Sequence, residues 1–292
     1  MEKREKIYTI YDLCGHTPAN IRLLVHIEDA EIPGDWQFFS SAIVRVINTK
    51  IECEYSVKEW LTSMWQSPSG YVYICSMDGK IHYKSGEAWK VFDLGNRYSL
   101  NHIWGLNDRE IYCCGLHGVL FQKDNNNWKR TRTDLKKDLL KIAGTSPEDL
   151  YALGSNGTLF YSDGKKWREI DSPTNFHLQS IFCESPNEVY ICGENGMLFK
   201  GSKKGWERID EVDFDLWDLE KFQGKILVAG GDEGILSIEN KKLVPFKEGI
   251  SVSGIKVIED TLFGFDINTL HKFDGKNWDT RKFDFSQVII NT

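Results

Sequence analysis

The sequence predicts an all-β protein that folds as a single β-propeller, and three observations support this prediction. Tryptophans recur every 39 residues, at Trp89, Trp128, Trp167 and Trp206. Glycines recur with the same spacing, ten residues before each tryptophan, at Gly79, Gly118, Gly157 and Gly196. Each unit holds four short apolar runs separated by turn residues, without the periodicity of a helix. A four-stranded unit repeated about every 40 residues is typical of a propeller blade.

The third unit shows how the strands are expected to follow one another. Its apolar runs are Leu139–Ala143, Leu150–Leu153, Thr158–Tyr161 and Trp167–Ile170. The connections Ser155-Asn156-Gly157 and Asp163-Gly164 contain residues that accept a positive φ, as tight hairpins require. Two later units have diverged, since one has Val244 in the tryptophan position and the next has Asn268 in the glycine position, followed by Trp278.

The repeats account for most of a single domain over residues 1–292. Six units cover residues 61–284, while residues 1–58 are about one blade long but lack the repeat signature. We therefore predict seven blades, the last one built from both termini, because such closure removes exposed sheet edges. Residues 1–58 would form its irregular N-terminal part and residues 286–291 its innermost, closing strand. Six blades with an N-terminal cap are the alternative.

The recurrent cysteines and tryptophans are interpreted as packing residues. Cys75, Cys114 and Cys192 occupy one repeat position that Leu153 and Ala229 fill in other units. A position that accepts Cys, Leu or Ala is expected to be buried rather than reactive. The recurrent tryptophan is expected to be a wedge between blades, because its large ring buries much apolar surface.

Charge and composition exclude several classes of function. The chain has 36 Lys and Arg against 43 Asp and Glu, a net charge of -7 and a pI of about 5.6. Neither nucleic acid nor an anionic membrane is an expected partner, because both need a basic surface. The charged N-terminus has no apolar stretch after it, which predicts a cytoplasmic protein. The seven cysteines form no pair with zinc-ligand spacing, so no metal is expected.

The repeats resemble those of the bacterial YVTN/BNR-like propellers, a part of the WD40-like superfamily. The resemblance covers residues 61–284 and rests on the pattern Gly-x-Leu/Ile-Phe/His-Tyr…Trp. Ser162-Asp163-Gly164-Lys165-Lys166-Trp167 keeps the Gly-to-Trp spacing of the sialidase Asp-box but lacks the residue between Asp and Gly. The resemblance implies a fold and says little about activity, because propellers carry many functions.

The sequence contains no motif that indicates catalysis. Hydrolase, phosphate-binding and dinucleotide-binding motifs are absent. His82 and His271 occupy a third-strand packing position, and His117 occupies a hairpin turn. We therefore predict no catalytic residue, no cofactor and no enzymatic activity.

The candidate site is a surface formed by loops at one rim of the propeller. The loop from Asp210 to Asp218 carries four Asp and one Glu interleaved with two aromatic residues, a composition suited to a basic protein partner. The predicted partner-binding residues are Tyr98, Phe176, His177, Asp210, Glu211, Asp213, Phe214, Asp215, Trp217, Asp218, Asp232 and Glu233.

Three functions remain open at this point. The first is a non-catalytic, cytoplasmic protein-binding propeller, monomeric when free, whose most specific form is an inhibitor or immunity protein that masks a basic toxin or enzyme. The second is a carbohydrate-binding or glycan-active propeller, since aromatic residues stack on sugars. The third is an assembly scaffold, which has the same sequence features as the first.

Overall fold

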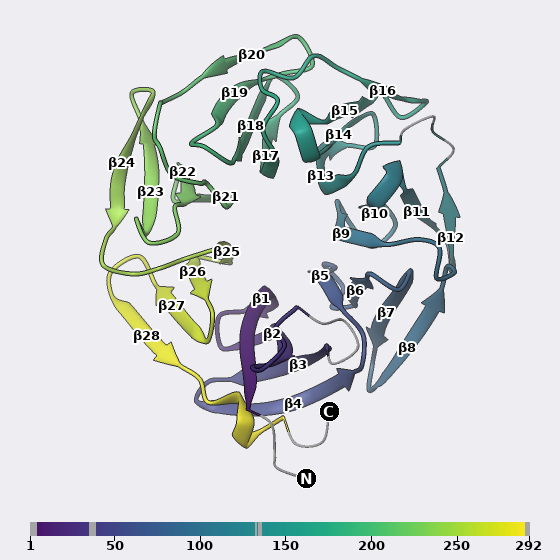
Figure 1. The fold of residues 1–292 in the computed structure, drawn as a ribbon, viewed down its shortest axis with the longest axis vertical. Coiled ribbons are helices and arrows are strands. Elements are labelled where there is room, and N and C mark those ends of the chain that lie inside the picture. Colours follow the sequence, from purple (N-terminus) through teal and green to yellow (C-terminus); the bar gives the residue numbers. More distant parts are fainter. Residues whose placement is uncertain (1–4, 35–38, 132, 134–135, 290–292) are drawn as a thin grey trace.

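Seven four-stranded antiparallel sheets form a ring around a central channel (Figure 1). The computed structural model describes residues 5–34, 39–131, 133 and 136–289. In every sheet the strands lie in chain order, with the first strand innermost and the fourth outermost. The prediction of an all-β propeller with seven blades is confirmed, and the six-blade alternative is wrong.

The blades are numbered in chain order. Blade 1 contains β1 (Lys6–Thr17), β2 (Asn20–Asp29), β3 (Ser40–Ile47) and β4 (Lys50–Val57). Blade 2 contains β5 (Leu61–Gln66), β6 (Val72–Ser76), β7 (Lys80–Ser85) and β8 (Ala88–Asp93). Blade 3 contains β9 (Leu100–Gly105), β10 (Ile111–Gly115), β11 (Leu120–Asp124) and β12 (Asn127–Arg130). Blade 4 contains β13 (Leu139–Ser146), β14 (Asp149–Gly154), β15 (Leu159–Ser162) and β16 (Trp167–Glu169).

The remaining blades follow the same plan. Blade 5 contains β17 (Leu178–Ser185), β18 (Glu188–Gly193), β19 (Leu198–Ser202) and β20 (Gly205–Arg208). Blade 6 contains β21 (Asp218–Phe222), β22 (Lys225–Ala229), β23 (Ile235–Glu239) and β24 (Lys242–Lys247). Blade 7 contains β25 (Gly254–Ile258), β26 (Thr261–Asp266), β27 (Thr269–Phe273) and β28 (Trp278–Lys282). In the described part of the chain, 3₁₀ turns occur at η2 (Leu116–Gly118), η3 (Ser155–Gly157) and η4 (Phe285–Gln287).

The hydrophobic core lies between the blades. Each of the seven seams between neighbouring blades holds its own cluster of buried apolar side chains. The strands are therefore apolar on both faces, as in Val72–Ser76, where all five residues are buried. Burial of apolar surface at every seam is what holds the ring together.

The structure confirms that the recurrent tryptophans and cysteines pack between blades. Trp89 of blade 2 stacks on Tyr55 of blade 1 with ring centroids 4.7 Å apart, and Trp206 of blade 5 meets Tyr151 of blade 4 edge-on. The recurrent cysteine position lies in the seam clusters of blades 2 and 3, 3 and 4, and 5 and 6. Burial raises the pKa of the Cys75 thiol to about 12.

The predicted contribution of the C-terminus to the closing blade is wrong for the residues described. All four strands of blade 1 come from the N-terminal segment, and β1 already occupies the innermost position. Asp284 accepts a hydrogen bond from the amide of Ser286 and caps the turn η4. The strand expected at 286–291 therefore does not form at residues 286–289. Residues 290–291 lie outside the described part. Phe285 and Ile289 instead cover the seam between blades 7 and 1.

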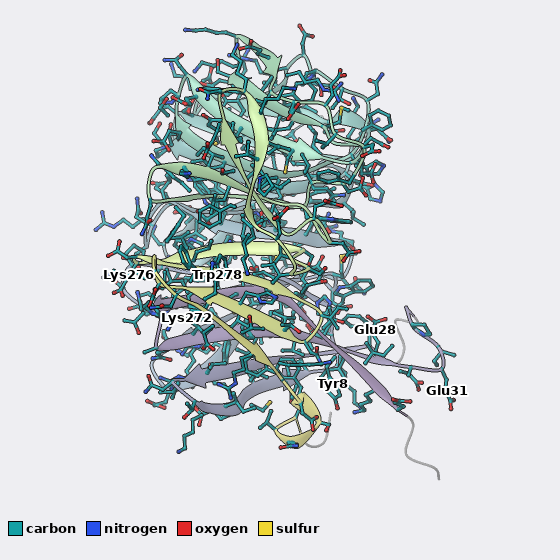
Figure 2. All side chains as sticks on the ribbon, turned by 90° about the vertical axis from the view of Figure 1, so that its left-hand side faces the viewer. Tyr8, Glu28, Glu31, Lys272, Lys276 and Trp278 are labelled. Carbon is teal, nitrogen blue, oxygen red and sulfur yellow. The ribbon has the colours of Figure 1, made fainter. Side chains whose placement is uncertain are left out.

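The two faces of the disc differ in their connections. The upper face carries the links from each outer strand to the next inner strand, together with the hairpins between second and third strands. The lower face carries the other hairpins. In Figure 2, Glu31, which follows β2, and Lys276, in the hairpin before β28, lie on opposite sides of the disc.

Candidate functional site

Every predicted partner-binding residue lies on or near the upper face. They come from the links before β9, β17 and β21 and from the hairpin between β22 and β23, except Asp218, which begins β21. The structure thus brings together the residues of blades 5 and 6, whereas Tyr98 lies far along the ring, before blade 3. Their individual environments divide them into buried and exposed groups.

Burial removes two of these side chains, Tyr98 and Asp210, from the surface available to a partner. Tyr98 is only 7% exposed and packs edge-on against Phe121. Asp210 is buried and accepts hydrogen bonds from the Lys242 ammonium and the Leu243 amide, so it joins the acidic loop to β24. Phe214 is partly buried in the seam between blades 5 and 6. The prediction is wrong for Tyr98 and Asp210, because their side chains are used within the fold, and it stays a prediction for the partly buried Phe214.

Two further acidic residues have structural contacts. The Asp215 carboxylate accepts a hydrogen bond of 2.9 Å from the amide of Asn195, which has a positive φ of 54° in the hairpin after β18. Asp138 accepts the equivalent bond from His117. Asp218 faces the central channel rather than the rim. These carboxylates position the rim loops.

The other predicted residues are accessible. Glu211, Asp213, Asp232 and Glu233 are exposed, His177 is half-buried, and Phe176 and Trp217 are 45% and 40% exposed. The Trp217 indole lies beside Gly231 of the hairpin that carries Asp232 and Glu233. An aromatic ring therefore sits next to two exposed carboxylates, from a different loop.

Carboxylates cluster on the upper face of blades 5 to 7. We call its eight carboxylates in the connections 194–197, 209–217, 230–234 and 248–253 the acidic sector: Glu194, Asp210, Glu211, Asp213, Asp215, Asp232, Glu233 and Glu248. No Lys, Arg or His occurs in these connections. Within the described chain, the exposed Asp213, Asp232, Glu233 and Glu248 form no ion pair. Such unpaired charges on one face attract a cationic partner.

Sequence reasoning missed Glu248 and three apolar residues on this face. Ile7, Tyr11 and Ile267 are 41%, 48% and 56% exposed. The Ile10 amide donates a hydrogen bond of 2.5 Å to the Ile267 carbonyl, which brings β1 beside the hairpin of blade 7. The repeat pattern could not identify these residues as exposed. Ile7 and Tyr11 belong to blade 1, which has no repeat signature, and Ile267 lies in a diverged unit.

The channel opens on the upper face as a funnel of about 390 Å³. Tyr11 and Trp217 lie at its wall, with the polar side chains of Asn101 and Gln179 between them. Within the described chain, the Gln179 amide, the Tyr11 hydroxyl and the Trp217 indole N–H make no hydrogen bond to protein. The funnel thus presents two aromatic rings and several free polar groups.

Six inner strands contribute one residue each to the floor of the funnel: Asp12, Ser63, His102, Lys141, Asp218 and Gly254. Ser180 of β17 occupies the corresponding position of the seventh inner strand. Three of these side chains accept a hydrogen bond from a backbone amide of the next blade. The bonds run from Met64 to Asp12 at 2.7 Å, from Ile142 to His102 Nδ1 at 3.3 Å, and from Ile255 to Asp218 at 3.3 Å. These polar residues therefore tie neighbouring inner strands together.

The charges around the floor are mutually compensating. Burial tends to raise the pKa of Asp218, but Lys141, with its Nζ 3.7 Å from Oδ1, and Lys256 lower it below the ordinary value. Burial tends to lower the pKa of Lys256, but Asp12, Asp218 and Glu220 raise it. His102 is neutral, because burial and the nearby Lys141 hold its pKa well below its ordinary value.

Glu220 is the channel carboxyl with a pKa near neutrality. Burial raises its pKa to about 7, and Lys256 only partly opposes this. A carboxyl with such a pKa is suited to general acid-base chemistry when a reacting group lies within reach. Its hydrogen-bonding partners are backbone groups of Lys221 and Val257, and no nucleophilic side chain of the described chain bonds to it.

The described residues contain neither a metal-binding cluster nor a membrane-spanning helix. No group of three or more His, Cys, Asp or Glu side chains there has the arrangement of a metal site. No described helix has the length and hydropathy needed to cross a membrane.

Comparison with known proteins bears on the fold. No family model and no curated protein matches the chain. Among solved structures, the WD40 β-propeller domain of Doa1 superposes with a TM-score of 0.70 and 10% identity, covering 93% of each chain. The chain has a WD40-like propeller fold.

Two further structures show how varied proteins with this fold are. YCF48 bound to D1 peptide has a TM-score of 0.67 and 12% identity, over 90% of this chain and 93% of that one. A catalytically inactive virginiamycin B lyase from Staphylococcus aureus with quinupristin has a TM-score of 0.67 and 12% identity, over 91% and 94%. At such identities the likeness establishes the fold, which commonly mediates protein binding, and not an activity.

Proposed function

We propose that this propeller is a non-catalytic protein-binding module that holds a basic partner against its upper face. The observation that carries the proposal is the acidic sector, whose exposed carboxylates have Trp217 and Phe176 beside or near them on the same face. Interfaces combine aromatic anchors with a charged rim in this way. The YCF48 structure with a bound peptide is a precedent for peptide binding by a similar fold.

The most specific form of the proposal is an inhibitor or immunity protein that masks a basic toxin or enzyme. Rapid capture is what such a protein needs, and unpaired charge on one face speeds association. We further propose that it acts in the cytoplasm, where its seven free cysteines match a reducing compartment.

Affinity capture with matched charge variants tests the proposal. The tagged protein is used to capture partners from the native organism, which are identified by mass spectrometry. Asp232→Lys with Glu233→Lys reverses two charges of the acidic sector, whereas Glu87→Lys with Asp260→Lys makes the same change in net charge on the lower face. We expect one basic protein with the wild type and the control, and about tenfold slower association with the upper-face variant.

Two outcomes distinguish the remaining forms. Rescue of cells from toxicity of the captured protein would support the inhibitor form, and several subunits of one assembly would indicate a scaffold instead. Equal association of both variants would refute the acidic sector as the binding surface.

Carbohydrate binding is the second candidate, and the funnel favours it. Trp217 lines the funnel with an exposed ring, and Tyr11, which stacks on His26 with one face, is 48% exposed. Asn101 and Gln179 also line the funnel, and the Gln179 amide makes no hydrogen bond within the described chain. Binding to a glycan array that Trp217→Ala abolishes, without any captured protein, would favour this function.

A further inference from the structure

The seam between blades 7 and 1 lacks the tryptophan that fills most other seams. In five blades a tryptophan on the outer strand pairs with the third strand across a hairpin of four intervening residues, as in Lys84↔Trp89 and Gly201↔Trp206. The same register in blade 1 is Val46↔Ile51. Ile51 packs against the seam cluster, but its side chain is much smaller than an indole.

A crevice of about 420 Å³ lies in this seam. We call it the closing crevice; its residues are Pro18, Ala19, Ile21, Val46, Asn48, Thr49, Phe263, Leu270, Lys272, Asp279, Arg281 and Phe283. Val46, the cross-strand partner of Ile51, is among them. Phe263 occupies the repeat position of Tyr73 and Tyr151, against which the tryptophans of the following blades pack. The crevice therefore borders the wedge position of this seam, because Val46 and Phe263 are the two residues that would flank an indole there.

The two walls are braced so that the crevice stays open. The Arg281 guanidinium of blade 7 donates hydrogen bonds to the carbonyls of Asn48, at 3.4 Å, and Thr49, at 2.9 Å, in blade 1. Phe283 and Phe285 stack with centroids 5.2 Å apart beside it. Strands of two rigid sheets form the walls, so collapse would require movement of whole blades.

The crevice combines an apolar floor with a cationic edge. Ile21, Val46, Phe263, Leu270 and Phe283 supply the floor, and all five are buried. The edge is formed by Lys272, Arg281 and Asp279. These three side chains together carry a net charge of about +1. Figure 2 shows Lys272 on blade 7, on the same side as Trp278. Within the described chain Lys272 forms no ion pair, so its ammonium is available to an anion.

We propose that the closing crevice binds a small planar aromatic anion, an aromatic carboxylate or sulfonate. Its ring lies against the position that the wedge tryptophan occupies at other seams, and its anionic group lies at Lys272 and Arg281. Volumes of this size are typical of small-molecule sites. Apolar walls contribute most of the affinity, while the cationic edge selects an anion over a neutral ring.

The test uses 8-anilinonaphthalene-1-sulfonate, whose fluorescence rises in an apolar site, and the neutral N-phenyl-1-naphthylamine. The full-length protein is expected to bind one sulfonate dye. Ile51→Trp places an indole in the wedge register and should abolish binding. Leu243→Trp places a tryptophan in the same register of blade 6, the other blade without one, where Ile238 pairs with Leu243, and should leave binding unchanged. Ala19→Trp, at the exposed edge of the crevice, is a second blocking variant if Ile51→Trp does not fold.

The charge is tested separately. Lys272→Gln should weaken binding of the sulfonate roughly threefold, as for a partly exposed ion pair, and leave the neutral dye unaffected. Absence of dye binding, or binding that persists in both blocking variants, would overturn the proposal. Equal affinity for both dyes and no effect of Lys272→Gln would overturn its anionic part.

Discussion

Replacement of the repeat glycine Gly196 by alanine should destabilise the protein far more than the same change at Gly86. Gly196 has a φ of +64°, and a Cβ built on it would lie 2.0 Å from the carbonyl oxygen of Val212 in the acidic loop. Gly86 has a similar φ of +76°, but a Cβ there meets nothing within 4 Å. Comparison of Gly196→Ala with Gly86→Ala therefore separates the conformational cost of a positive φ from the cost of the close contact with Val212.

The magnitudes follow from these geometries. A positive φ costs an alanine about 1–2 kcal/mol at either site. At Gly196 the loop must also move away, which breaks the hydrogen bond from the Asn195 amide to the Asp215 carboxylate, a charge-assisted bond that contributes about 1.5–3 kcal/mol. We expect Gly86→Ala to lower the free energy of unfolding by about 1–2 kcal/mol and Gly196→Ala by about 3–5 kcal/mol.

Urea unfolding followed by tryptophan fluorescence measures both values. Folding of each variant is verified first by far-UV circular dichroism. Because the contact lies at the acidic loop, Gly196→Ala should also slow association with a captured partner, whereas Gly86→Ala should not. Equal destabilisation by the two substitutions would refute the reasoning, since it would mean that the close approach to Val212 contributes nothing.

Three further predictions concern the seams, the channel and the thiols. Trp206→Ala should cost about 2–4 kcal/mol in urea unfolding, since it empties part of a seam, whereas the exposed Trp217→Ala should cost less than about 1 kcal/mol; similar costs would contradict the assignment of wedge and surface roles. Burial raises the pKa of Glu220 from 4.5 to about 7, so the folded state holds this proton more tightly than the unfolded state and stability falls as the pH rises from about 5 to 7. Glu220→Gln should reduce that fall by up to about 3 kcal/mol; an unchanged pH profile of the unfolding free energy would argue against titration of this carboxyl. Burial raises the pKa of Cys114 and Cys192 well above the ordinary value, so Ellman's reagent at pH 8 should modify these thiols only after unfolding, and rapid modification of the native protein would contradict their packing role.

The blade architecture was predictable because it depends on local patterns that repeat. Residues such as Asn156 and Gly157 have the positive φ that their hairpin requires, and these turn residues recur in register with the apolar runs. Trp89 and Cys75 could be assigned to the seams for the same reason, since a position filled only by apolar side chains in every unit must face a neighbour.

The candidate site was predictable only in part. The acidic loop before β21 was visible as a local excess of carboxylates, but the sequence does not distinguish Asp213, which is exposed, from Asp210, which is bound to Lys242. Tyr98 resembled a rim residue by its position in a loop, yet it packs on Phe121 because that loop turns inward. Side-chain environment depends on contacts between distant segments, which spacing does not reveal.

The amino-acid sequence alone determined the structure within each blade. The lengths of the strands, the positions of the turns and the identity of the seam residues follow from the pattern of apolar and turn residues along the chain. Ring closure, the polar floor of the channel and the closing crevice were decided by tertiary structure alone. Each of them joins residues that no repeat relates, as when Arg281 reaches Asn48 across the seam. The physical reason is that hydrogen bonding and apolar burial within a blade are satisfied by adjacent strands, whereas the fit between the first and last blades exists only once the ring has formed.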